Sequence, residues 1–132
     1  MITRELLIPL LVEASPTFAP TWRAFRDKWA DRPPLPHYVI LGDFARHMAA
    51  LLAASDETTL KRIFAVIERL EVDGDDYVRE ASTVGLLEDL QNANLHESTK
   101  PEQFERFLLP KTARSWKKVQ AFWDRGEIIT DD

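Results

Sequence analysis

Few residues in this sequence stand at spacings that could support chemistry, and the clearest case pairs a carboxylate with an imidazole. Asp43 and His47 lie four residues apart in a helical pattern, so their side chains can touch. A carboxylate that orients a histidine is half of a hydrolytic triad, but no nucleophile in a strained turn completes it. We therefore expect a structural pair. The alternative is an enzyme with a non-local site around Asp43 and His47, with Glu80 as a further suspect.

The sequence predicts no metal site and no cofactor. Its three histidines, His37, His47 and His96, do not stand at the spacings that zinc and di-iron sites use. The chain has no cysteine, which excludes disulfides, thiolate ligands and a thiol nucleophile. The acidic run that begins at Asp73 resembles a calcium loop in composition, yet Val78 stands where such a loop needs glycine.

The acidic residues are concentrated in one stretch of the chain. The 132 residues include 17 basic and 22 acidic side chains, a net charge of −5, and residues 71–109 alone hold 3 basic and 10 acidic ones. This balance argues against a general nucleic-acid binder, whereas a local acidic surface steers a basic protein partner. The bland alternative is a solvated surface that keeps the protein soluble. The candidate partner-binding residues are Asp73, Asp75, Asp76, Glu80, Glu88 and Asp89.

A basic stripe near the end of the chain is a second charged feature. It consists of Lys111, Arg114, Lys118 and Arg125. The stripe could meet phosphates, but it has no glycine-rich or base-stacking companion and belongs to an acidic protein. We favour a solvated face, or salt links to the acidic stretch of the same chain.

Helical periodicity covers nearly the whole chain, and no strand pattern stands out. The predicted fold class is all-α: a single domain of six or seven helices over residues 1–126, followed by a loosely ordered acidic tail at 127–132. Gly74 is expected to end one helix in the left-handed conformation. The helices are predicted at about 3–14, 17–30, 37–54, 55–72, 76–93, 101–109 and 112–125.

The predicted helix at 76–93 has two apolar stripes instead of one. At 100° per residue, one stripe contains Thr83, Leu86 and Leu90, and the other contains Val78 and Gly85. Two stripes indicate two helical neighbours. We therefore expect this helix to be central, with only a narrow polar strip in contact with solvent.

Residues 75–90, which read DDYVREASTVGLLEDL, are similar to the second half of a HEAT-type helical repeat. Such repeats commonly read Asp, then Val-Arg, then Ala, then a leucine-rich turn, and Val78, Arg79, Ala81 and Leu86 match that order. The resemblance implies either a compact bundle or a short HEAT-like right-handed stack. It also implies that the Asp and Arg link neighbouring turns and have no catalytic role.

The whole chain resembles a group of small all-helical bacterial proteins, through the segments GDFARHM at 42–48 and VGLLEDLQN at 84–92. Proteins of this type often act as immunity proteins for polymorphic toxins, or as adaptors. The resemblance implies an immunity protein that occludes a basic toxin with its acidic face, or an adaptor or regulatory protein for a cellular partner. The lack of cysteine and of a long apolar stretch predicts a cytoplasmic protein that does not enter membranes.

Overall fold

The computed structural model describes residues 1–131, and within this range its regular secondary structure is helical apart from one isolated β-bridge between Ile2 and Gly74. A π-helical segment, Ala81–Leu87, joins α5 to α6 as one continuous helix, and 3-10 helices lie at Pro16–Phe18, Ala93–Leu95 and Pro101–Phe107. The predicted all-α class is confirmed, with seven α-helices in the described part of the chain. They are α1 (Arg4–Ala14), α2 (Ala19–Lys28), α3 (His37–Ala53), α4 (Glu57–Asp73), α5 (Asp76–Glu80), α6 (Glu88–Gln91) and α7 (Pro110–Arg125).

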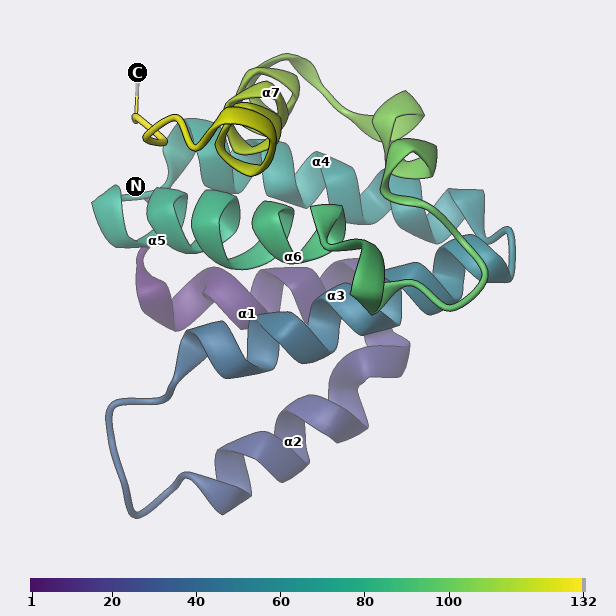
Figure 1. The fold of residues 1–132 in the computed structure, drawn as a ribbon. Helices are drawn as coiled ribbons and strands as arrows, with labels where there is room; N and C mark the ends of the chain where they lie inside the picture. The colour runs from purple at the N-terminus through teal and green to yellow at the C-terminus, as the bar shows by residue number, and fades with distance from the viewer. Residues whose placement is uncertain (132) are drawn as a thin grey trace.

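The continuous helix of α5, the π segment and α6 runs through the middle of the molecule (Figure 1). Its π segment contacts α3 on one side and both α4 and α7 on the other. Helix α1 packs against α4, and α2 covers the far side of α1 and α3 (Figure 1). The predicted central position of residues 76–93 is therefore confirmed, whereas a HEAT-like stack stays a prediction.

The π segment replaces the uniform α-helix that the sequence predicted between 76 and 93. A π-helix bonds each residue to the fifth along the chain, so it holds more residues per turn than an α-helix. Here it lets the helix meet two neighbours at once. Gly85 packs so closely on α3 that an added Cβ would lie 3.0 Å from Leu41 and 3.2 Å from Tyr38, while Thr83 turns its hydroxyl toward α4.

The apolar faces of the helices meet in one core. Phe44 of α3, Phe64 of α4 and Phe104 are among the largest fully buried side chains. The ring of Phe64 stacks on Phe107 with centroids 5.8 Å apart, which ties the 3-10 helix Pro101–Phe107 to α4. Burying an aromatic or aliphatic side chain of this size stabilises the fold by about 1.5–3 kcal/mol. Burial of apolar side chains in this core therefore stabilises even the short helices.

The beginning of the chain pairs with the turn between α4 and α5. The Ile2 N–H donates to the Asp73 carbonyl at 2.8 Å, and the Asp75 N–H donates to the Ile2 carbonyl at 2.9 Å. The intervening Gly74 has φ −70° and ψ 150°, so the left-handed cap predicted here is wrong. Glycine is needed for space instead. An added Cβ would overlap the Leu70 carbonyl oxygen and lie 2.7 Å from Val78 Cγ1.

We predict that Gly74→Ala lowers the free energy of unfolding by about 1–3 kcal/mol, because the new methyl group must displace backbone atoms. Gly42→Ala is the matched control. Its Cβ would lie 3.6 Å from Asp89 Oδ2, an ordinary contact, and alanine favours the interior of α3 by about 0.5–1 kcal/mol. Urea denaturation of both variants measures the difference. Equal stabilities would contradict the steric explanation.

Candidate functional site

The six candidate acids divide into two groups in the structure. Asp73, Asp75 and Asp76 lie at the turn from α4 into α5. Asp75 caps α5 by accepting a hydrogen bond from the Val78 N–H at 2.9 Å. Asp76 is 97% exposed and pairs with Arg79 at 2.6 Å. At least two of the three therefore already have partners within the fold.

Glu80, Glu88 and Asp89 lie further along the same helix, and the Asp89 carboxylate lies next to Gly42 of α3. Burial, followed by the charges of Glu80 and Glu88, raises the pKa of the Tyr38 phenol. The Tyr38 ring packs against this helix at Gly85, where an added Cβ would lie 3.2 Å from the ring. Tyr38 is itself 42% exposed. We call this surface, formed by Tyr38, Glu80, Glu88 and Asp89, the Tyr38 face. It combines one accessible aromatic ring with three carboxylates of the neighbouring helix.

Two of the three carboxylates of the Tyr38 face are only partly solvated, whereas Glu80 is exposed. Glu88 and Asp89 are half-buried, and burial raises the pKa of both. The charge of Glu88 raises the pKa of Asp89 further, and Arg46 opposes this effect. Two carboxylates that repel each other in a partly dry position gain stability when a cation approaches. The face is therefore electrostatically suited to basic side chains.

The structure does not bring Asp43 and His47 together. The Asp43 carboxylate pairs with Arg46, and His47 Nε2 lies 2.7 Å from Ser15 Oγ. Burial lowers the pKa of His47. Ser15 is only 1% exposed, so its hydroxyl cannot reach a substrate in solution. The Ser15–His47 hydrogen bond instead links the end of α1 to α3, which is a structural role.

The other two histidines also have partners inside the fold. His37 Nδ1 lies 3.0 Å from the Tyr77 hydroxyl, and His96 bonds the Thr99 hydroxyl and the Leu90 carbonyl. Among residues 1–131, no three His, Asp or Glu side chains gather where a metal ion could bind. None of the helices in this range is both long and apolar enough to span a membrane.

The structure shows a cavity of about 240 Å³ that sequence reasoning missed. It lies between α5, the π segment and α7, and residues 129–131 close one side of it. Acidic, basic and hydroxyl groups all line it, which is unusual for a simple packing defect. The lining residues that matter below are Glu71, Arg79, Glu80, Thr83, Lys111 and Ser115.

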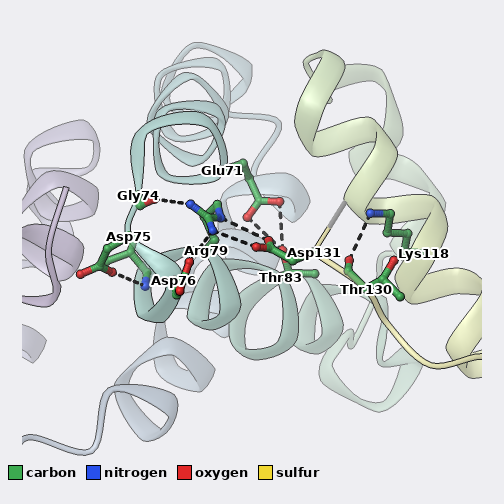
Figure 2. Close-up of polar contacts among 10 residues, drawn as sticks. Glu71, Gly74, Asp75, Asp76, Arg79, Thr83, Lys118, Thr130 and Asp131 are labelled. Atoms are coloured by element: carbon green, nitrogen blue, oxygen red, sulfur yellow. Dashed lines mark hydrogen bonds and ion pairs between the residues drawn. The ribbon is translucent and has the colours of Figure 1, made fainter. Parts of the chain in front are cut away.

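Glu71 is the most unusual member of this cavity, because a carboxyl group with 2% exposure is buried among helices. The Thr83 hydroxyl lies 3.0 Å from each of its carboxyl oxygens (Figure 2). Burial raises the pKa of Glu71, and this outweighs the opposite effect of the Ser115, Ser82 and Thr83 hydroxyls and of Lys111. Glu71 therefore keeps its proton to a higher pH than an exposed glutamate.

Glu68, one turn earlier in α4, behaves in the opposite way. Its carboxylate accepts hydrogen bonds from the Lys111 N–H, the Thr112 N–H and the Thr112 hydroxyl at 2.7–2.9 Å. Burial alone would raise the pKa of Glu68, but these bonds outweigh burial and lower it. The ionised carboxylate thus caps the N-terminus of α7, where the helix dipole favours negative charge. Helix α4 presents one charged and one proton-retaining glutamate to α7.

The tail of the chain lies over the cavity mouth. Arg79 Nε and Nη2 donate to the two carboxylate oxygens of Asp131 at 3.2 and 2.8 Å, and Lys118 Nζ donates to the Thr130 carbonyl at 3.1 Å (Figure 2). Two members of the predicted basic stripe therefore lie here: Lys111 lines the cavity, and Lys118 contacts the tail. The loose order expected of residues 127–132 stays a prediction, and Asp132 lies outside the described residues.

We predict that Glu71→Gln makes folding less sensitive to pH. Because the folded pKa is raised, the native state binds more protons than the unfolded state between the two pKa values, so stability falls as pH rises through that window. Glutamine at position 71 cannot ionise, so the variant does not lose stability in this window. The stability gain of the variant over the natural protein should therefore grow from pH 4.5, the ordinary pKa of a glutamate, to pH 8, by about 1.4 kcal/mol per unit of raised pKa.

Denaturation at several pH values measures this effect, with the exposed Glu102→Gln as the control. A constant difference between Glu71→Gln and the natural protein across this range would show that Glu71 ionises normally.

The comparisons with known proteins identify one family. No curated protein and no solved structure matches the chain. A family model described as Domain of unknown function (DUF7674) matches residues 8–124. This range contains the Tyr38 face, Glu71 and the basic residues of the cavity, whereas residues 129–131 lie outside it. Because the match covers most of the chain, the protein belongs to the DUF7674 domain family.

Proposed function

We propose that this protein is a stoichiometric protein-binding module that docks a basic partner on the Tyr38 face. The observation that carries the proposal is the exposed Tyr38 ring, which packs at Gly85 on the helix that carries Glu80, Glu88 and Asp89. Tyrosine is enriched among the few residues that dominate binding energy at protein interfaces. Surrounding charges mainly steer the partner and select it, so the two features have complementary roles.

The specific version of this proposal is an immunity protein that occludes a basic toxin. Occlusion needs a rigid surface and no catalytic group, and the face lies on two helices that the close Gly85 contact holds together. A regulatory adaptor for a cellular protein would use the same physics with another partner. The enzyme alternative is weaker, because Asp43 and His47 have separate partners and the Ser15 hydroxyl that bonds to His47 is buried.

The charge of the face also predicts how binding depends on pH. The pKa values of Glu88 and Asp89 are raised, and an approaching cation favours their ionised forms. Binding of a basic partner therefore releases protons. Affinity is expected to rise with pH through the range in which these two carboxyl groups ionise.

The test uses the product of the neighbouring gene, where that product is a basic toxin. We predict that Glu80→Lys combined with Glu88→Lys slows association about tenfold at low ionic strength and flattens its dependence on salt. Tyr38→Ala should mainly speed dissociation, by about tenfold. Stopped-flow or surface-based kinetics separate the two rates, and rescue of cell growth reports neutralisation of the toxin.

Glu13→Lys is the matched control, because Glu13 is an exposed acid on α1 and its reversal changes the net charge in the same direction. It should leave both rates nearly unchanged. Association that is equally slow in the control and in the double variant would mean that only net charge matters. Unchanged kinetics in the double variant and in Tyr38→Ala would exclude the Tyr38 face as the interface.

A further inference from the structure

We infer that the cavity beside α5 and α7 is a second binding site, for an extended peptide that carries an aliphatic residue two positions before an acidic one. In the structure, residues 129–131 of the chain itself occupy the mouth of this site as an intramolecular ligand. This inference does not rest on the proposed function, because its ligand is acidic and the groups that recognise it, Arg79 and Lys118, do not belong to the Tyr38 face; Glu80 borders both sites.

The contacts of the tail are those by which proteins recognise peptides. Arg79 meets the two oxygens of the Asp131 carboxylate with two nitrogens, the geometry that makes arginine selective for carboxylates. Lys118 binds a backbone carbonyl, which any residue at position 130 would offer. Ile129 packs against the core, while Ile128 is 88% exposed. Neighbouring side chains thus take opposite sides, as in an extended strand.

Arg79 is held in place without the help of the tail. Its Nη1 donates to the Gly74 carbonyl at 2.8 Å, and its Nη2 donates to Asp76 at 2.6 Å (Figure 2). Both partners belong to the turn that starts α5, a turn that Ile2 also braces. A guanidinium that is positioned before its ligand arrives loses less conformational entropy on binding. The Arg79 guanidinium is therefore already positioned before a peptide carboxylate binds to it.

The tail is weakly held and does not fill the cavity. The Asp131 side chain is 66% exposed, and exposed ion pairs contribute about 0–1 kcal/mol. Gly126 ends α7 in the left-handed conformation, and the next two residues are exposed, so few contacts oppose release. About 240 Å³ remains beside the tail, with Lys111 and the proton-retaining Glu71 on its walls. A peptide from another molecule can therefore replace the tail and use this space.

The test adds the peptide acetyl-Glu-Ile-Ile-Thr-Asp-amide, which copies residues 127–131, to the full-length protein. We predict that Asp131→Ala binds this peptide about two- to fivefold more tightly than the natural protein does, the range that the loss of one exposed ion pair allows. The natural tail competes at a high effective concentration, and the substitution weakens that competitor. Isothermal titration calorimetry measures both affinities.

Two further variants make the result specific. Adding Arg79→Lys to Asp131→Ala keeps the charge but removes the two-nitrogen contact, and it should cost most of the regained affinity. Asp124→Ala and Glu88→Lys are controls: Asp124 is an exposed acid on α7 outside the tail, and Glu88 belongs to the Tyr38 face. Both should bind the peptide as weakly as the natural protein does.

Equal peptide affinity in the natural protein and in Asp131→Ala would overturn the inference, as would no binding by Asp131→Ala at millimolar peptide. Undiminished binding after Arg79→Lys would also overturn it. A melting curve for each variant confirms that the folded protein is being compared. Failure of the peptide to bind would leave the Tyr38 kinetics untouched, so the two proposals stand or fall separately.

Discussion

The burial of the Glu71 carboxyl group is the constraint around which the centre of this molecule is arranged. A buried carboxyl needs hydrogen-bond partners, and Thr83 supplies one from the π segment. Because that segment is wound more widely than an α-helix, the same helix can place Thr83 beside Glu71 on one side and pack Gly85 against α3 on the other. The same continuous helix carries Glu80 and Glu88, whose charges both raise the pKa of Tyr38. Both candidate binding surfaces therefore include residues of this one helix.

Most of the helices follow from local sequence signals, and the features that do not follow depend on contacts between distant residues. Asp56 begins α4 as a cap that bonds the Thr59 N–H, and Gly126 ends α7 with φ 67°, both from short-range patterns. The π segment has no comparable signal, because its cause is the pair of neighbours described above. Gly74 was recognised as special for the wrong reason, since only the folded chain shows that Leu70 and Val78 crowd it.

In the candidate sites, too, some features follow from local sequence and others depend on contacts between distant residues. The sequence could locate the acidic helix, but it could not separate Asp75, which caps its own helix, from Glu88, which is half-buried and whose charge acts on Tyr38. Glu71 did leave a trace in the sequence, because it stands four residues after Ile67 on the apolar face of α4. An acid at such a position is a better indication of a built polar site than an acid in a charged run.

The pairing of Ile2 with residues 73 and 75 also bears on the order in which the chain assembles. It joins positions more than 70 residues apart, so a long loop must close before either hydrogen bond can form. Contacts of this kind slow folding relative to helix pairs that are adjacent in sequence. During synthesis on the ribosome, the first residues must wait until α4 has emerged. The amide protons of Ile2 and Asp75 would therefore report on the completion of folding.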